Sequence, residues 1–150
     1  MKLKVLFGSV FLLMFLCIQG VGLCLDQIQW YAFEKGETVG KQAGKKVFLY
    51  IYSNNCPYCD LMAQNTFSNS AVIEYLNQHF IAIKVNSDEE KGIARRYKIR
   101  GNPTNIFIEE DFKTIGNLPG YVPPADMLNI LKYIQTNSYK NMTLKAFLKQ

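Results

Sequence analysis

The sequence predicts an α/β fold, in which helices cover both faces of a central mixed β-sheet. Six consecutive apolar or aromatic residues at 47–52 are typical of a strand buried on both faces. A second apolar strand is expected at 80–85, and segments with helical spacing separate the strands. Residues 104–108 and 113–118 have the pattern of two strands joined by the polar turn 109–111, which predicts an antiparallel hairpin and therefore a mixed sheet.

The first part of the domain is less regular. Residues 26–44 mix aromatic residues with glycines, which predicts a short strand or turn followed by a weak helix. Residues 53–55 are turn formers that end the central strand. A helix is expected to begin at Pro57, because the first helical turn does not use the N–H that proline lacks. Residues 68–70 interrupt this helix, and apolar residues continue it through Leu76.

Two more helices are expected in the second half of the chain. Ser87 and Glu90 have the spacing of a capping box, which predicts a helix that begins at Ser87 and ends near Tyr97. Pro124 opens the last clear helix, whose apolar residues repeat with helical spacing. Residues 137–150 are expected to form a small C-terminal extension, either a short helix packed on the domain or a frayed tail.

The N-terminus has the pattern of a secretory signal peptide. Lys2 and Lys4 precede an uncharged apolar run at 5–18, and the small residues Gly20 and Gly22 follow it. The run is short for a membrane-spanning helix, which needs about 20 apolar residues. We therefore expect cleavage near Gly22 and export of the protein, to the periplasm or to another oxidising compartment.

Cleavage divides the chain into a signal peptide, residues 1–22, and one domain, residues 23–150. About 125 residues are enough for one hydrophobic core without disulfide staples. Two alternatives stay open: an uncleaved signal that anchors the protein in a membrane, and lipid attachment at Cys24. Cys17 lies inside the apolar run and is expected to leave with the signal.

The charge of the chain argues against nucleic acid as a partner. Loss of the two lysines of the signal lowers the formal net charge from +5 to about +3, which is too mild to predict nucleic-acid binding. The densest basic cluster comprises Arg95, Arg96, Lys98 and Arg100. We expect this cluster to be a solvated helix end and loop, with a partner-binding surface as the alternative.

Cys56 and Cys59 lie at the junction of the buried central strand and the helix that follows it. The N-terminus of a helix favours negative charge, so the Cys56 thiol is expected to lose its proton more readily than that of an ordinary cysteine. Cys59 lies one helical turn further on, close enough to close a disulfide. We therefore expect Cys56 to be the exposed nucleophile and Cys59 to be the resolving thiol.

The cysteine pair has two other interpretations. A structural zinc site needs four ligands, and only His79 and Cys24 remain in the mature chain. A purely structural disulfide is the stronger alternative, but it does not explain the proline between the cysteines or the buried strand before them. A redox role is therefore favoured over both, and no metal is expected.

Three segments resemble the thioredoxin superfamily in order and spacing. They are residues 46–59 with their Cys-Pro-Tyr-Cys motif, residues 84–88, and residues 97–104 with their Asn-Pro-Thr sequence. Residues 59–80 are also similar to exported bacterial thioredoxin-like proteins, which include the SoxW group and the C-terminal domain of the membrane reductase DsbD. The resemblance covers about residues 26–150 and implies a thioredoxin fold.

The resemblance also implies the residues that bind substrate. Pro103 matches the cis-proline that faces the disulfide in this fold, where it presents the backbone of Asn102 to an extended substrate strand. Pro57 and Tyr58 resemble the dipeptide of glutaredoxins and of the DsbC and DsbG isomerases, and Tyr58 is expected to touch substrate. Such proteins work through a redox-active disulfide, so no other cofactor is expected.

The sequence departs from thioredoxins at two positions near the cysteines. Tyr50 stands where thioredoxins have a buried aspartate that helps to deprotonate the resolving thiol, and a phenol is a poor base at neutral pH. Lys84 matches the lysine that partners this aspartate, and without the acid it is expected to point into solvent. Asn55 replaces the tryptophan before the first cysteine, which makes the surroundings of the nucleophile more polar.

We therefore expect a periplasmic thiol–disulfide oxidoreductase that reduces protein disulfides. Its expected partners are protein disulfides or thiols and a membrane electron donor similar to DsbD or CcdA, and the protein is expected to be a monomer. A thiol oxidant or an isomerase of the same fold is the enzymatic alternative, because the sequence does not fix the reduction potential. A non-catalytic binding module with a structural disulfide is the alternative of another class.

Overall fold

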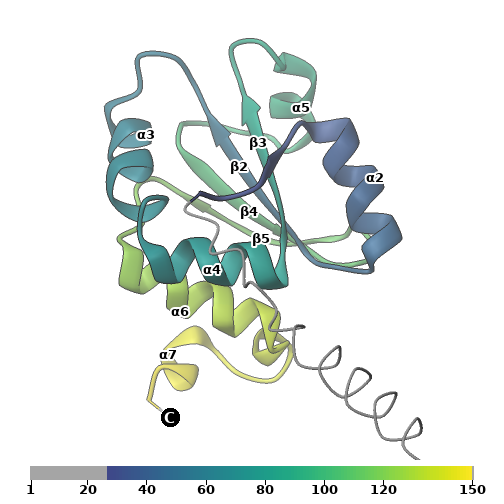
Figure 1. Cartoon of the computed structure of the whole chain (residues 1–150), viewed down its shortest axis with the longest axis vertical. Helices are drawn as coiled ribbons and strands as arrows, with labels where there is room; N and C mark the ends of the chain where they lie inside the picture. The colour runs from purple at the N-terminus through teal and green to yellow at the C-terminus, as the bar shows by residue number, and fades with distance from the viewer. Residues whose placement is uncertain (1–26, 150) are drawn as a thin grey trace, which may run out of the picture.

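The computed structural model describes residues 27–149, and Figure 1 shows how their helices and strands are arranged. The strands of this part of the chain form one five-stranded sheet in the order β1-β3-β2-β4-β5. They are β1 Trp30–Tyr31, β2 Val47–Tyr52, β3 Ile81–Asn86, β4 Thr104–Ile108 and β5 Thr114–Pro119. β1 and β2 run parallel to β3, whereas β4 is antiparallel to β2 and to β5. The predicted mixed sheet with its hairpin is thus confirmed.

Helices cover both faces of the sheet, as predicted (Figure 1). On one face lie α2 Phe33–Ala43 and α5 Lys91–Arg96. On the other face lie α3 Pro57–Leu61, the π-helical turn η1 Met62–Thr66, α4 Ser70–His79 and α6 Pro124–Gln135. The sheet is therefore the middle layer of three, which is the α/β arrangement that the alternation of strands and helices predicts.

β2 is the centre of the core because its side chains alternate between the two helical layers. Val47 and Leu49 join the apolar cluster under α2, whereas Phe48 and Tyr50 join the cluster under α4 and α6. Every side chain of residues 47–51 is at most 2 % exposed. The strand that leads to the cysteines is thus held on both faces, as its apolar sequence predicts.

The helix that follows the cysteines is broken earlier than predicted. It begins at Pro57 as expected, but after Leu61 the backbone changes to the π-helical turn η1. The predicted interruption at residues 68–70 is confirmed. Asn69 caps α4 there, since its side-chain oxygen accepts hydrogen bonds from two backbone N–H groups of the first turn.

The predicted capping box at Ser87 is wrong. α5 begins at Lys91, with Glu90 as its N-cap residue. The hydroxyl of Ser87 instead accepts a hydrogen bond from Asn102 Nδ2 at 2.9 Å. The Ser87 side chain therefore bonds to Asn102 of a distant loop and does not cap the helix that the local pattern predicts.

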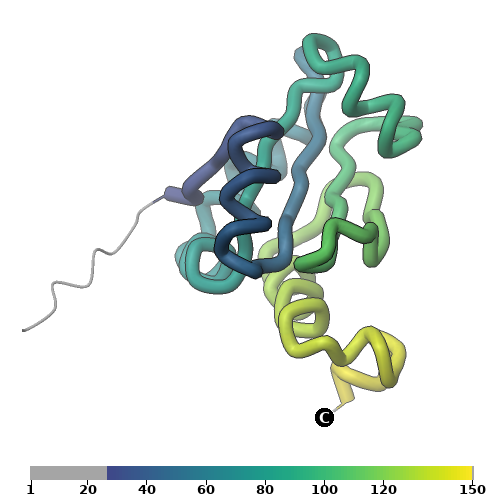
Figure 2. Tube along the Cα trace, turned by 90° about the vertical axis from the view of Figure 1, so that its right-hand side faces the viewer, coloured from purple at the N-terminus to yellow at the C-terminus, as the bar shows by residue number. Residues whose placement is uncertain are grey.

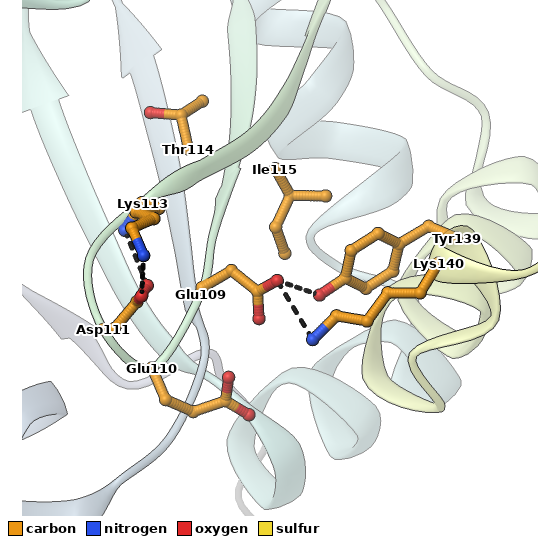
Figure 3. Close-up of a pocket in the computed structure, with 8 residues that line it drawn as sticks. All are labelled: Glu109, Glu110, Asp111, Lys113, Thr114, Ile115, Tyr139 and Lys140. Carbon is orange, nitrogen blue, oxygen red and sulfur yellow. Dashed lines mark hydrogen bonds and ion pairs between the residues drawn. The ribbon is translucent and has the colours of Figure 1, made fainter.

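The C-terminal segment forms η2 Ser138–Lys140 and α7 Leu144–Phe147. Both views place this segment at the opposite end of the molecule from α5 (Figures 1 and 2). Figure 3 shows how it is fixed: Tyr139 Oη and Lys140 Nζ both bind Glu109 Oε1 in the turn between β4 and β5. The segment is therefore held by a polar network at the hairpin as well as by α6.

The predicted signal peptide at residues 1–22 lies outside the described residues, as does Cys24. Within residues 27–149, no helix is long and apolar enough to cross a membrane. Export, signal cleavage and the fate of Cys24 therefore remain predictions.

Candidate active site

The loop between β2 and α3 is tied to the segment after β3. Ser87 N–H donates to Tyr52 O at 2.7 Å, and Asn54 N–H donates to Asp88 Oδ2 at 2.8 Å. Asn86 adds a third link, because its Nδ2 donates to Asn54 Oδ1 at 3.1 Å. These hydrogen bonds hold the residues before the first cysteine against the end of the neighbouring strand.

Cys56 and Cys59 are joined by a disulfide at the start of α3, with their Cα atoms 5.2 Å apart. Cys56 is the N-cap residue and is half-buried, whereas Cys59 is only 6 % exposed. Pro57 occupies the first helical turn. The N–H of Cys59 donates to Cys56 Sγ at 3.2 Å, so a backbone dipole points at the outer sulfur. Once the disulfide is reduced, this contact favours negative charge on Cys56.

The Asn102–Pro103 peptide bond is cis and lies at the same edge of the sheet. Pro103 directly precedes β4, and the first residue of β4, Thr104, pairs with Ile51 of β2. The loop therefore reaches the end of β2 that leads into the cysteines. Pro103 O accepts a hydrogen bond from Gly120 N–H at 2.7 Å, which ties the loop to the end of β5.

Large apolar side chains are exposed on α3 beside the cysteines. Tyr58 is 61 % exposed and Leu61 is 39 % exposed, and Pro57 is exposed as well. Tyr58 and Leu61 are three residues apart, so they project from the same side of the helix. Tyr58 was predicted from its place inside the motif, whereas Leu61 was not, although it follows Tyr58 at helical spacing.

A hollow of about 480 Å³ lies behind Cys59, and its lining includes Tyr50, Tyr52, Cys59, Asp60 and Lys84. Tyr50 is buried, and its hydroxyl lies 3.5 Å from the carbonyl oxygen of Cys59. Burial, with a smaller contribution from the charge of Asp60, raises the pKa of Tyr50 well above its ordinary value. The phenol therefore stays protonated at neutral pH and cannot accept a proton from Cys59.

Two charged groups face this hollow from opposite elements. Lys84 of β3 is exposed, as predicted, and its ammonium lies 4.5 Å from the centre of the Tyr52 ring. Asp60 of α3 supplies the only carboxylate among the described residues that line the hollow. Sequence reasoning missed Asp60. The available signal was an acid next to the resolving cysteine in a chain that has tyrosine at the position of the usual buried acid.

The described part of the chain offers no alternative centre for a metal. Between residues 27 and 149, no three His, Cys, Asp or Glu side chains are grouped so that they could hold an ion. The ring of His79 packs against that of Tyr75, with the centroids 4.4 Å apart. The site thus consists of a disulfide, a cis-proline loop, exposed apolar side chains and one carboxylate.

The chain belongs to the thioredoxin-like domain family, whose model matches residues 33–135. Among solved structures, the solution structure of a thioredoxin from Thermus thermophilus superimposes with a TM-score of 0.66 and 29 % identity, over 72 % of this chain and 87 % of that one. The predicted thioredoxin fold is therefore confirmed. Proteins of this fold use a redox-active disulfide in place of a cofactor.

Two curated relatives extend the comparison. An uncharacterized protein of Caenorhabditis elegans is 29 % identical over 121 residues, which are 72 % of this chain and 16 % of the relative. The thiol:disulfide interchange protein DsbD of Actinobacillus pleuropneumoniae is 27 % identical over 118 residues, which are 75 % of this chain and 20 % of DsbD. The predicted resemblance to DsbD is confirmed, although the chain spans a fifth or less of these relatives.

Proposed function

We propose that the protein is a thiol–disulfide oxidoreductase that reduces disulfides of exported proteins. The observation that carries the proposal is the position of the cysteine pair. Cys56 is half-buried at the end of the central strand, a backbone N–H points at its sulfur, and Cys59 is shielded behind it. Reduction of a substrate disulfide in two exchange steps uses this combination of an accessible nucleophile and a resolving thiol.

The reaction has two exchange steps. In the reduced protein, the Cys56 thiolate attacks one sulfur of a substrate disulfide, whose S–S bond breaks as one substrate thiolate leaves and takes up a proton. Cys59 then gives up its proton and attacks Cys56 Sγ in the mixed disulfide. This step closes the Cys56–Cys59 bond seen in the structure and releases the second substrate thiol. Two electrons pass from the cysteine pair to the substrate.

The loop at Asn102 and Pro103 positions the substrate. An extended substrate segment lies along these residues, so that its backbone is added at the edge beside the cysteines. Pro57 and Tyr58 contact the residues that flank the substrate cysteine, together with Leu61. The exposure of Tyr58 and Leu61 supports this role, because large apolar side chains in the open are typical of contact surfaces.

Asp60 accepts the proton of Cys59. The carboxylate and the thiol line the same hollow, while the buried phenol of Tyr50 holds its own proton too tightly to serve as a base. Water in a hollow of about 480 Å³ can pass the proton from the sulfur to the carboxylate. Asp60 thus replaces the buried acid that thioredoxins have at the position of Tyr50.

The protein acts as a periplasmic monomer, and a membrane protein similar to DsbD or CcdA returns two electrons to its cysteine pair. The N-terminal signal pattern and the similarity to DsbD support this setting. Mass spectrometry of the purified protein tests export. A mature chain that begins near residue 23 is expected, whereas an intact Met1 would show an uncleaved anchor, and a lipid on Cys24 a lipoprotein.

Reduction of insulin tests the activity. The parent protein is expected to reduce insulin in the presence of dithiothreitol, and Cys56→Ser is expected to lose this activity by on the order of a thousandfold. Asn102 and the other loop residues stay unchanged in this variant, so substrate can still bind. Equal activity of Cys56→Ser and the parent would show that the disulfide is only structural.

The direction of electron flow is tested separately, by equilibration with glutathione buffers. A reduction potential near that of thioredoxin, about −270 mV, is expected for a reductase. A potential near that of DsbA, about −120 mV, would make the protein a thiol oxidant instead.

A further inference from the structure

A second hollow, of about 540 Å³, lies between α5 and the segment that leads to Pro103. Four of its lining residues are cationic: Lys91, Arg95, Lys98 and Arg100. All four are exposed. We call this hollow, with its four cations, the basic hollow.

The cations of the basic hollow have no ion-pair partner among the described residues. Arg96, their neighbour in the sequence, differs: it lies 3.2 Å from Glu37 and packs over the ring of Phe33. The nearby acids Asp88 and Glu89 accept hydrogen bonds from Asn54 and Asn86 and form no ion pair with these cations, and no acid lines the hollow within residues 27–149. The hollow therefore gathers four cations that no ion pair of the described residues neutralises.

The basic hollow is joined to the substrate loop. Ser87 belongs to its lining, and Ser87 Oγ accepts the hydrogen bond from Asn102 Nδ2 at 2.9 Å. Ser87 N–H also binds the end of β2, directly before the loop that carries the cysteines. Figures 1 and 2 both place α5 at the same end of the molecule as this loop. The hollow therefore adjoins the loop at Asn102, and it lies at the same end of the molecule as the segment that leads into the cysteines.

We propose that the basic hollow binds acidic side chains of the protein substrate, in the segment that flanks its reactive disulfide. The inference rests on the proposed function, because it places the substrate at Asn102 and Pro103. It adds a preference among substrates: an anionic flank is captured by the four cations while its disulfide is presented to Cys56. Exposed charges at the rim of a contact act mainly on the rate of association, which depends on salt.

A protein segment fits these observations better than a nucleic acid or a lipid surface. The cations line a hollow that adjoins the substrate loop through Ser87, whereas a membrane surface requires cations on a face that a flat bilayer can reach. The formal net charge of the whole chain is only +5, so the attraction is local rather than general. Binding to anionic vesicles is nevertheless the rival outcome that the experiment includes.

The experiment compares three disulfide-linked peptides that differ only in four flanking residues, which are all Asp, all Ser or all Lys. The reduced full-length protein is mixed with each peptide, and the second-order rate constant of reduction is measured at 20 mM and 500 mM NaCl. We expect the Asp peptide to react about tenfold faster than the Ser peptide at low salt, and the Lys peptide more slowly. The advantage of the Asp peptide is expected to vanish at high salt.

Two variants with the same change in charge locate the effect. Arg95→Glu/Arg100→Glu is expected to lose the preference for the Asp peptide and to react with the Ser peptide as the parent does. Lys132→Glu/Lys149→Glu changes two exposed lysines outside the hollow and is expected to keep the preference. The unchanged rate with the Ser peptide shows that each variant is folded.

Four results would overturn the inference. Equal rates of the parent with the Asp and Ser peptides would remove the preference while leaving the proposed function intact. An equal loss in both variants would assign the preference to net charge and not to the hollow. Sedimentation of the parent with phosphatidylglycerol vesicles, lost in Arg95→Glu/Arg100→Glu without any peptide preference, would assign the hollow to membranes. No reaction with any peptide would overturn the proposed function and the inference together.

Discussion

Charged side chains form ion pairs at one end of the central strand β2, whereas the cations near its other end have no ion-pair partner among the described residues. At its amino end, Lys46 lies 2.6 Å from Glu110 and 3.6 Å from Glu109. Tyr139 and Lys140 also bind Glu109, as Figure 3 shows. We call these five residues the paired end. At the carboxyl end of β2 lie the cysteines, the exposed side chains of α3 and the basic hollow, whose cations have no ion-pair partner in residues 27–149. We call this region the open end.

The comparison separates groups that hold the fold from groups that meet a partner. Lys46 is 4 % exposed, and a buried cation is tolerated only when it is paired, so the carboxylates beside it serve stability. The hollow at the paired end is the larger, about 650 Å³ against 540 and 480 Å³ at the open end. Its charges already neutralise one another, so size alone does not identify the active site. Unpaired charge beside a reactive group is the better guide.

Asp60→Asn tests the open end and has the largest expected effect among the variants that keep both cysteines. The variant is expected to resolve the mixed disulfide tenfold to a hundredfold more slowly at pH 7, on the order expected for loss of a proton acceptor that water partly replaces. The rate of release of the second substrate thiol, followed in stopped flow, measures this step. The difference should shrink above about pH 8.5, where an ordinary cysteine thiol ionises without help.

Asp126→Asn is the matched control for that prediction. Asp126 is an exposed acid in the first turn of α6, outside the hollow behind Cys59. It is expected to leave both the rate and its pH profile unchanged. A slow Asp60→Asn variant whose rate stays low at every pH would show a structural defect in α3 and not a lost base.

Lys46→Met tests the paired end. The variant keeps most of the apolar stem but leaves Glu109 and Glu110 without the cation, so the free energy of unfolding in urea is expected to fall by about 2 kcal/mol. Insulin reduction at 25 °C is expected to stay within about twofold of the parent. Lys132→Met, on the exposed side of α6, is the control and should change neither quantity. Loss of activity without loss of stability would break the comparison.

Tyr139→Phe removes one hydrogen bond of the paired end and is expected to cost about 1 kcal/mol at pH 7. Partial burial acts to raise the pKa of Glu109, but hydrogen bonds from Tyr139 and Lys140 outweigh it and lower the pKa below its ordinary value of 4.5. A lowered folded-state pKa contributes stability above the unfolded value, and this contribution is lost as the pH falls. Urea titrations should therefore show that the difference in free energy of unfolding between the parent and Tyr139→Phe becomes smaller below about pH 4.5.

Tyr58→Ala has the smallest expected effect. Truncation of this exposed side chain is expected to raise KM for insulin about threefold, in the range found for most contact residues, with little change in stability. Leu148→Ala removes an apolar side chain of similar exposure, 52 % against 61 %, at the other end of the molecule. It should leave KM unchanged, and an equal change in both variants would show that the contact is not specific to the open end.

Much of the fold can be predicted from local sequence patterns. The apolar run at 47–52 predicts the buried central strand, and the turn at 109–111 predicts the hairpin, because burial on both faces and turn chemistry leave direct traces in residue type. The break at residues 68–70 was also foreseeable, since asparagine is a strong N-cap residue.

Other features depend on partners that are remote in the sequence. The predicted capping box at Ser87 is wrong because the fold brings Asn102 close, and the Ser87 hydroxyl accepts a hydrogen bond from Asn102 instead. Arg95 and Arg96 are adjacent in the sequence and have the same side chain, but only Arg96 forms an ion pair with Glu37 of α2. The predicted basic cluster therefore contains one arginine that binds within the fold, while the others line the basic hollow. The hollow behind Cys59 is formed by β2, α3, η1 and β3, so the sequence shows Asp60 beside Cys59 but not the space that the two side chains share.

Trapping of a mixed disulfide tests the central claim most directly. Cys59→Ser should attack a disulfide substrate but fail to release it, so peptide mapping by mass spectrometry should find the substrate bound to Cys56 through a bond that dithiothreitol cleaves. Cys56→Ser should hold no substrate on Cys59, which is only 6 % exposed. Absence of the adduct from Cys59→Ser, or equal adducts on both cysteines, would contradict an outer nucleophile backed by a shielded resolving thiol.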